Sequence, residues 1–361
     1  MKKRWSINGR FLAQPFSGVQ RYAYEILYAL DELMSKGDAS AKGLELELVV
    51  PSETPNLPVL SAIAVKRAGK GKGHVWEQTV LPAVAGDGVL SLCNSGPLSI
   101  RQQIVCIHDV NVRLFPDSYS RAFRTLYRLL HPALGRRARR IATVSRYSAK
   151  MLAGHAIAPA RKILVATNGF EHALRWTPEF SDRVRAAATP YTVFVLGSPA
   201  PHKNVGMLMT LADRLGDAGI NIAVAGPTDS RVFHSLLDGQ SARNIHWLGR
   251  ITDNEIAAIL SKCLCLAFPS YVEGFGLPAV EAMAWGCPVI ASDRTSLPEI
   301  GGEAVLYAPP DAPEIWLSQI LRLHEDNTLR ESMILSGRKQ ARAFSWRTSA
   351  ARYLQAMTEL E

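Results

Sequence analysis

Short segments rich in Val, Ile and Leu alternate with segments of helical period along the whole chain, and this alternation constrains the fold most. In the first half, strands are expected at 5–7, 45–50, 88–93, 104–107, 141–144 and 163–166, and helices at 19–34 and 118–134. A second series follows Pro190, with strands expected at 192–196, 221–225, 245–248, 263–268, 288–291 and 304–307. Apolar strands separated by helices are typical of parallel sheets covered on both faces. The sequence therefore predicts an α/β protein with two doubly wound domains.

The length agrees with two domains, because 361 residues divide into two of about 180. We place the domains at 1–187 and 188–345. A last helix at 346–361 has an apolar side and is expected to pack back toward the first domain. A composition of 47% hydrophobic and 20% charged residues excludes disordered, collagen-like and disulfide-scaffold classes.

The net charge of +9 is divided unevenly between the halves. Before Pro190 there are 27 Lys and Arg against 14 Asp and Glu, and from Pro190 onward 14 against 18, so the halves carry +13 and −4. A uniform basic coat for nucleic acid would not divide in this way. The asymmetry predicts an anionic partner for the first half and a different role for the second.

The cysteines and the N-terminus indicate a cytoplasmic protein. Five Cys residues, mostly inside apolar runs, are typical of buried reduced thiols, and none has the spacing of a zinc ligand pair. The basic start at residues 2–4 is followed by Asn8, Gly9 and Arg10 instead of the apolar core of a signal peptide. No run of 18 or more apolar residues could span a bilayer.

The most informative segment is FPSYVEGFGLPAVEAMAWGCP, residues 268–288. Glu273 lies in the loop after an expected strand, and Glu281 lies one turn into the helix that Pro278 helps to begin. Gly274 and Gly276 let the backbone approach a ligand, and free amides at a helix start bind anions. Two carboxylates could therefore hold the two sugars of a nucleotide sugar. The alternative is a surface loop followed by a helix that merely carries an acid near its N-terminus.

This segment resembles the E-x7-E signature of the retaining family 4 glycosyltransferases. The resemblance implies a GT-B fold, in which two Rossmann-like domains face a central cleft, the first binding the acceptor and the second the nucleotide sugar. It also implies that Glu273 and the amides of Phe275, Gly276 and Leu277 contact the donor sugar, and that Glu281 binds the ribose hydroxyls.

Further segments resemble the family in the expected order. Residues 195–204 are similar to the turn whose basic residues bind the diphosphate, although Ser198 stands where many members carry arginine. The resemblance thus assigns the positive charge to Lys203, with His202 beside it. Gly249 and Ile251 match the strand end whose backbone reads the nucleobase.

In the first half, Gly18 matches a glycine loop beside the donor phosphates, although it could equally be an ordinary helix cap. His108 follows a strand and resembles the family histidine that contacts the donor sugar or the acceptor hydroxyl, with Asp109 next to it. Trp76 and Glu77 match an acceptor-side segment, in which Trp76 is interpreted as packing. No metal site is expected, and helix amides with Lys203 would stabilise the departing diphosphate.

The basic segment 121–140 contains seven arginines and no acid, with apolar residues at helical spacing. It is interpreted either as a core-facing helix with a solvated basic side or as a helix on an anionic membrane surface, with Arg136, Arg137, Arg139 and Arg140 at that surface.

Together these features predict a retaining, metal-independent hexosyltransferase, with mannose from GDP-mannose as the expected donor. The expected acceptor is a lipid-linked or oligosaccharide chain in bacterial O-antigen or exopolysaccharide synthesis, reached in the cytoplasm or at the inner face of its membrane. The first alternative is a UDP-sugar transferase of the same fold. A nicotinamide oxidoreductase would need G-x-G-x-x-G after the first strand, which is missing. A nucleic-acid-binding protein is suggested only by the pI of about 9.4.

Overall fold

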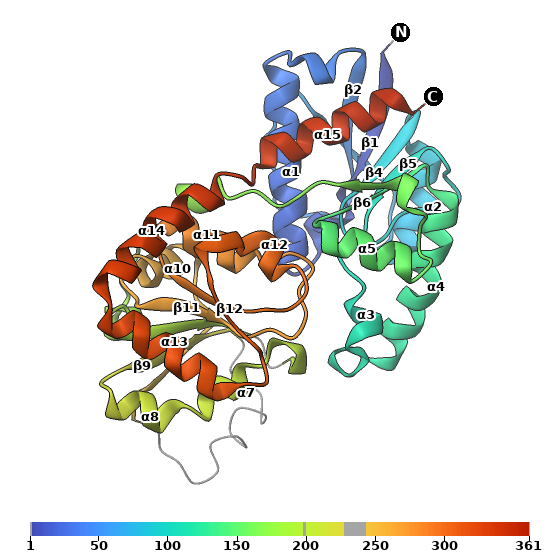
Figure 1. Ribbon diagram of the computed structural model, residues 1–361. Helices are drawn as coiled ribbons and strands as arrows, with labels where there is room; N and C mark the ends of the chain where they lie inside the picture. The colour runs from blue at the N-terminus through green and yellow to red at the C-terminus, as the bar shows by residue number, and fades with distance from the viewer. Residues whose placement is uncertain (1, 198–199, 227–242, 361) are drawn as a thin grey trace. The chain divides into compact units, whose positions relative to one another are not determined.

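The computed structural model describes residues 2–197, 200–226 and 243–360, and Figure 1 shows their course. The chain forms two compact units. The first contains residues 1–169 and 345–361, and the second contains residues 170–344.

The first unit is built on a parallel sheet with the strand order β3-β2-β1-β4-β5-β6-β7. The order runs outward in both directions from β1 and β4, as in a doubly wound sheet. Right-handed crossovers then place helices on both faces. The described strands are β1 (Lys3–Asn8), β2 (Leu44–Pro51), β3 (Ala64–Ala68), β4 (Gly88–Ser91), β5 (Gln103–Cys106), β6 (Arg140–Thr143) and β7 (Ile163–Val165).

Serine caps begin three helices of this unit, one of them at Ser345. The Ser120 hydroxyl accepts a hydrogen bond from the Phe123 amide, so α4 begins three residues later than the expected helix. Ser145 caps α5 through the Ser148 amide at 2.9 Å. The helices are α1 (Gly18–Ser35), α2 (Gly73–Val84), α3 (Asn111–Leu114), α4 (Arg121–Arg137), α5 (Arg146–Gly154) and α15 (Trp346–Glu359).

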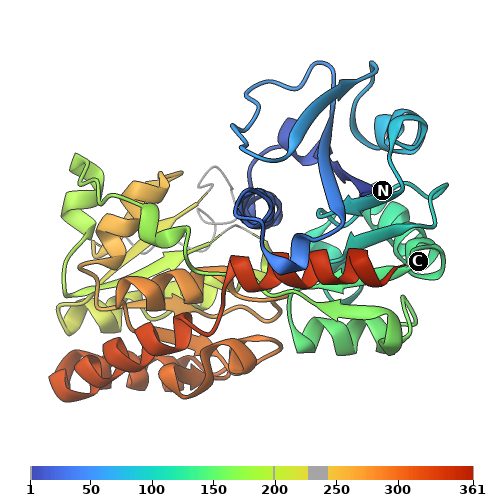
Figure 2. The same cartoon turned by 90° about the horizontal axis from the view of Figure 1, so that it is seen from above.

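Helix α15 comes from the end of the chain and packs on α1 in the first unit, as Figures 1 and 2 show. The Tyr22 and Tyr353 hydroxyls are 2.8 Å apart, and the Trp346 ring meets Tyr22 edge-on at 5.7 Å. Both tyrosines are fully buried. The apolar side of the last helix is therefore part of the core of the first unit.

The second unit contains a parallel sheet with the order β10-β9-β8-β11-β12-β13, again doubly wound. Its described strands are β8 (Thr192–Leu196), β9 (Asn221–Ala225), β10 (Ile245–Gly249), β11 (Cys265–Phe268), β12 (Val289–Ser292) and β13 (Leu306–Ala308). Its described helices are α6 (Asp182–Ala187), α7 (Val205–Met209), α8 (Ala212–Asp217), α10 (Asp253–Leu260), α11 (Leu277–Trp285), α12 (Leu297–Gly301), α13 (Pro313–Glu325) and α14 (Asn327–Ala341).

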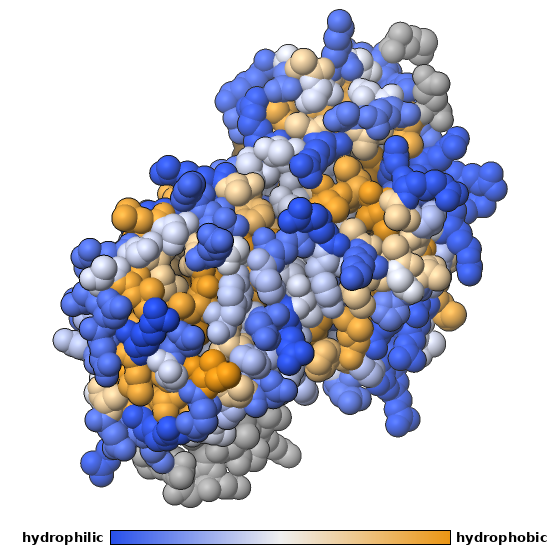
Figure 3. Space-filling model, viewed as in Figure 1, coloured by the Kyte–Doolittle hydropathy of each residue, from blue (hydrophilic) through white to orange (hydrophobic). Residues whose placement is uncertain are grey.

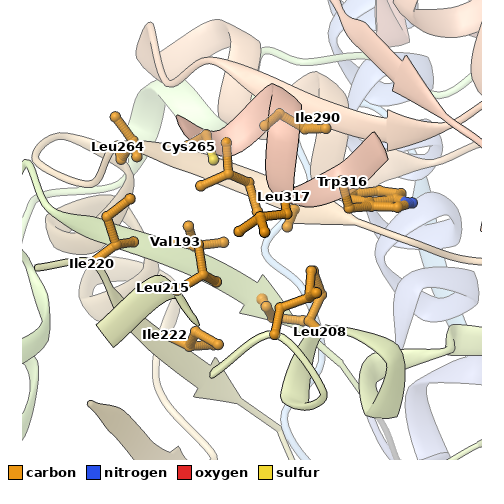
Figure 4. Packing of buried hydrophobic residues seen from close by; sticks show 14 of the residues in the cluster. Val193, Leu208, Leu215, Ile220, Ile222, Leu264, Cys265, Ile290, Trp316 and Leu317 are labelled. Carbon is orange, nitrogen blue, oxygen red and sulfur yellow. The ribbon is translucent and has the colours of Figure 1, made fainter. Parts of the chain in front are cut away.

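The core of the second unit gathers strand residues and helix residues around β8, as Figure 4 shows. Val193 and Ile222 lie in the sheet, and Leu208, Trp316 and Leu317 cover it from α7 and α13. The Trp316 indole is fully buried and its Nε1–H donates to the Pro309 carbonyl at 2.9 Å. This packing fixes the loops that leave β8 and β11.

The division between the units lies at residues 169 and 170, earlier than the expected boundary at 187. Residues 170–187 belong to the second unit because they pack on α10. The Arg183 guanidinium donates to both carboxylate oxygens of Glu255, and the Ser181 hydroxyl donates to the same carboxylate at 2.6 Å. The Thr177 amide donates to the Asn254 side chain at 2.9 Å.

All five cysteines are free thiols. In the part of the chain that the structure describes, no helix is both long and apolar enough to cross a membrane. Figure 3 shows hydrophobic residues in patches broken by hydrophilic ones on the face drawn there.

Candidate functional site

The strand order of the second sheet reverses between β8 and β11, and the predicted diphosphate and sugar residues follow these two strands. In doubly wound sheets, ligands bind outside the carboxyl ends of the strands at this reversal. Lys203 lies at the end of a short 3-10 helix after β8, and Glu273 lies in the loop after β11. The Tyr271 amide donates to the His202 carbonyl at 2.8 Å, which ties the two loops together.

Lys203 and Glu273 form an ion pair in this place. The Lys203 ammonium donates to Glu273 Oε1 at 2.7 Å, and the two side chains are 26% and 11% exposed. The ammonium also lies 5.7 Å from the centre of the Phe268 ring. Burial, then the neighbouring Lys203, lower the pKa of His202, so this imidazole is neutral near pH 7. The positive charge of this pair of neighbouring residues is therefore on Lys203 and not on His202.

The loop from Glu273 to Leu277 is held by its backbone carbonyls. The Ser296 hydroxyl lies 3.0 Å from the Glu273 carbonyl and 2.9 Å from the Phe275 carbonyl, to which it can donate. Gly276 has φ of 107°, and a β-carbon there would lie 2.6 Å from Leu297 Cδ2. Within the described part of the chain, no hydrogen bond is donated by the amides of Phe275, Gly276 or Leu277.

Two of these amides precede α11 and the third begins it. They are therefore free donors at the helix start, in the loop that also carries Glu273, the partner of Lys203. The structure thus brings together five predicted residues, Lys203, Glu273, Phe275, Gly276 and Leu277. Gly274 lies in the same loop. Ser198 lies outside the described residues.

Glu281 lies on α11 and is paired with a histidine that the sequence did not indicate. His172 Nε2–H donates to Glu281 Oε1 at 2.8 Å, and both side chains are buried. The His172 ring meets Trp176 edge-on at 5.5 Å, and the Trp285 indole donates to the Ala173 carbonyl at 3.0 Å. The pair joins residues 109 positions apart, which no local motif reveals.

The expected nucleobase residues lie at another strand end of the same sheet. Gly249 ends β10 with φ of 66°, and its carbonyl accepts from the Gly226 amide at 2.8 Å. Ile251 follows two residues later and is half-buried. Among the described residues, no hydrogen bond joins these two residues to the Lys203–Glu273 pair.

In the first unit, His108 follows β5 and is buried. Its Nε2–H donates to the Leu92 carbonyl at 2.9 Å, which leaves Nδ1 as an acceptor. Burial lowers its pKa to about 4, so the ring is neutral near pH 7. Asp109 Oδ1 accepts from the Asn111 amide at 2.8 Å.

Trp76 and Glu77 have structural partners in the first unit. The fully buried Trp76 donates to the Ala68 carbonyl at 2.8 Å, as expected for a packing residue. Glu77 is also fully buried and accepts from Arg10, Asn8 and Ser95 at 3.1, 2.7 and 2.9 Å. Burial raises the pKa of Glu77, but His74, Arg10 and the other donors together lower it below its usual value. Glu77 is thus a buried anion paired with Arg10.

Gly18 is the first residue of α1, preceded by Ser17 as the N-cap. No atom lies within 4 Å of an ideal β-carbon at Gly18, so open space adjoins this position. Arg136 and Arg137 end α4, Arg139 follows it, and Arg140 begins β6. The described residues hold no group of three or more His, Cys, Asp or Glu that could bind a metal ion.

Known structures share this architecture over nearly the whole chain. Sucrose-phosphate synthase from Thermosynechococcus elongatus superposes with a TM-score of 0.72 over 99% of both chains, at 19% identity. Anabaena HepE in complex with UDP and glucose gives 0.70 over 100% of both chains, at 16% identity. Two Rossmann-like parallel-sheet units of this kind define the GT-B class of glycosyltransferase.

Sequence comparison finds glycosyltransferases among the proteins similar to this chain. Residues 177–340 match the family Glycosyl transferases group 1. The chain is 26% identical over 278 residues to the O-antigen chain mannosyltransferase B of Escherichia coli, covering 72% of this chain and 71% of that protein. The match to the glycosyltransferase group 1 model thus lies within the second unit, and the chain is similar to a mannosyltransferase over most of its length.

Proposed function

We propose that the protein transfers mannose from GDP-mannose, with retention of configuration, to a lipid-linked or oligosaccharide acceptor in bacterial O-antigen or exopolysaccharide synthesis. The observation that carries the proposal is the Lys203–Glu273 pair beside three free amides at the reversal of the second sheet. Mannose and the O-antigen role are supported by the similarity to the Escherichia coli O-antigen mannosyltransferase.

In this proposal the donor lies across the start of α11. The free amides and the Lys203 ammonium bind diphosphate oxygens. The amides have no acceptor in the described structure, and the ammonium exchanges its contact with Glu273 for a phosphate oxygen. The Glu273 carboxylate exchanges its lysine partner for a donor-sugar hydroxyl, and Glu281, oriented by His172, accepts from the ribose hydroxyls. His108 is assigned to a sugar or acceptor hydroxyl, from which its neutral Nδ1 would accept a hydrogen bond.

Retention follows from attack on the face that the diphosphate leaves. The bond from the acceptor oxygen to the anomeric carbon forms as the bond to the phosphate oxygen breaks, and that phosphate oxygen takes the acceptor's proton. Lys203 and the helix amides stabilise the negative charge on the departing diphosphate, so a divalent metal is not required.

A UDP-sugar donor is the second candidate, because HepE, which shares the fold, is a complex with UDP and glucose. The backbone contacts expected at Gly249 and Ile251 do not distinguish guanine from uracil. The choice of donor therefore depends on a direct measurement.

The test is a donor panel in the presence of EDTA. Release of nucleotide diphosphate and transfer of sugar are measured with GDP-mannose, GDP-fucose and UDP-glucose. We expect turnover of GDP-mannose with EDTA present. A preference for UDP-glucose would support the second candidate, a UDP-sugar donor. Strict dependence on a divalent ion would contradict the mechanism.

A further inference from the structure

Three segments of the first unit line a cavity at one edge of its sheet. They follow the carboxyl ends of β1, β2 and β3, which are parallel neighbours in the sheet. The lining residues fall within 10–14, 51–55 and 71–73, and the cavity has a volume of about 430 Å³. Doubly wound sheets bind ligands at the carboxyl ends of their strands, and a cavity of this size is typical of small-molecule sites.

Thr54, one of the lining residues, has an unpaired hydroxyl. Thr54 is 2% exposed, and among the described residues its Oγ1 has no hydrogen-bond partner. Its backbone is held in place, because the amide donates to the Pro51 carbonyl at 3.0 Å and the carbonyl accepts from the Arg67 guanidinium at 2.9 Å. Buried hydroxyls in folded proteins are nearly always hydrogen-bonded, since an unsatisfied one destabilises the fold. The Thr54 hydroxyl therefore needs a partner from outside the chain.

The start of α2 adds hydrogen-bond donors to the same cavity. Gly73 is the first of the 12 residues of this helix, and no side chain caps it. Within the described part of the chain, the amides of Gly71, Lys72 and Gly73 donate no hydrogen bond. No atom lies within 4 Å of an ideal β-carbon at Gly73, so open space adjoins the helix start. These amides can therefore donate to the oxygen atoms of a ligand.

The charges of the lining residues are balanced. Arg10 is 4% exposed, and its Nε donates to Oε1 of the fully buried Glu77 at 3.1 Å. At the surface, Lys72 Nζ lies 3.9 Å from Glu53 Oε2. Each cation that lines the cavity thus has its own carboxylate, and little net charge remains to attract an ionised ligand.

We propose that this cavity binds an uncharged sugar unit of the acceptor, with the Thr54 hydroxyl and the amides at the start of α2 as its polar contacts. Sugar hydroxyls accept hydrogen bonds from amides and pair with another hydroxyl, and the C–H faces of the ring pack on apolar residues such as Leu12 and Pro51. The inference rests on the proposed function, which it deepens by naming the class of acceptor group that the first unit recognises. The binding step itself needs no donor.

The test measures sugar binding by ligand-observed NMR in the absence of donor. The probes are the methyl glycosides of mannose, galactose and N-acetylglucosamine, with inorganic phosphate and glucuronate as anionic probes. Thr54→Val replaces the unpaired hydroxyl with a methyl group, and Thr54→Ser keeps the hydroxyl. Thr192→Val is the matched control, because Thr192 is fully buried in the second unit and its hydroxyl is paired with that of Thr189 at 2.9 Å.

We expect at least one methyl glycoside to bind wild type, Thr54→Ser and Thr192→Val, and to bind Thr54→Val roughly 2- to 12-fold more weakly. Thr54→Val should also raise the melting temperature by about 2 to 4 °C, because it removes an unsatisfied hydroxyl, whereas Thr192→Val should lower it. Equal sugar affinity of Thr54→Val and wild type would overturn the proposal. So would a lowered melting temperature of Thr54→Val, or binding of the anionic probes alone.

Hydrolysis of GDP-mannose by wild type is followed separately, which distinguishes failure of this inference from failure of the proposed function. Sugar binding that depends on Thr54 without hydrolysis of any donor would support the cavity and contradict the proposed function. Donor hydrolysis by a protein that binds none of the glycosides would refute only the cavity.

Discussion

Replacing Lys203 with methionine tests the candidate donor site most directly. Methionine keeps an unbranched apolar stem but removes the ammonium group, which contacts Glu273 and lies 5.7 Å from the centre of the Phe268 ring. The change leaves the free amides of Phe275, Gly276 and Leu277 in place. Any loss of nucleotide binding then reports the ammonium group itself.

The magnitude follows from the contact that is lost. A hydrogen bond to a charged group contributes about 1.5 to 3 kcal/mol, which corresponds to a roughly 10- to 150-fold increase in the Kd for GDP. His202 cannot compensate, because burial lowers its pKa and keeps it neutral. The variant also leaves the nearly buried Glu273 carboxylate without its partner, so folding stability should fall by about 1 to 3 kcal/mol.

Calorimetry with GDP, which has no sugar, separates the two effects. The double variant Lys203→Met/Glu273→Gln should recover stability but still bind GDP weakly, because the charge that meets the diphosphate is missing. Arg214→Ala is the control, since its ion pair with Glu314 is exposed and lies outside the candidate site. If Lys203→Met bound GDP as tightly as wild type, or if the double variant regained full affinity, the role assigned to Lys203 would be wrong.

Three further predictions concern other parts of the site and fold. His172→Phe should raise the Kd for GDP about 10-fold, because it releases Glu281, and His172→Gln should restore part of the affinity. If calorimetry gave His172→Phe and wild type the same affinity for GDP, the positioning role of His172 would be refuted. Gly276→Ala should destabilise the protein by about 1 to 3 kcal/mol, because its φ of 107° is strained for alanine and Leu297 is close. Gly18→Ala should leave the melting temperature unchanged and lower only turnover, because open space adjoins Gly18. Finally, His131 is buried with a pKa lowered to about 4, so the unfolded chain takes up its proton first as the pH falls from about 6.5. Stability should therefore decrease between pH 6.5 and 4, and His131→Gln should reduce the slope of the unfolding free energy by up to about 1.4 kcal/mol per pH unit in urea titrations.

The strands that the sequence predicts most clearly are continuous apolar runs. The segments around Ile104, Ile141 and Ile290 are apolar runs, and the structure forms strands at each of them. The edge strand β3 was not predicted, because its sequence AVKRA is largely exposed and carries Lys66 and Arg67. An edge strand has one sheet neighbour and needs no continuous apolar run. A run of apolar residues is thus what allows a strand to be predicted from a single sequence.

The sequence also predicts only part of the candidate site. Glu273, Gly276 and Glu281 lie within nine residues, so their spacing alone suggested a common ligand. His172 and Arg10 were missed because each acts through a partner distant in the chain, Glu281 and Glu77. The lowered pKa values of His202 and His108, which keep both rings neutral, also depend on burial. The residue types alone do not specify that burial.

The charge asymmetry persists when the chain is divided as the structure divides it. The first unit has 26 Lys and Arg against 13 Asp and Glu, and the second has 15 against 19, so they again carry +13 and −4. Net charge does not locate the candidate donor site, because the groups proposed to bind anions in the acidic unit are backbone amides and one lysine that is already paired with Glu273. In the basic unit, by contrast, Arg10 is neutralised by Glu77, while another cavity, at the end of α4, has no acid among its described lining residues. Five of the cations of the first unit are therefore gathered at this one cavity, namely Arg101, Arg136, Arg137, Arg139 and Lys162.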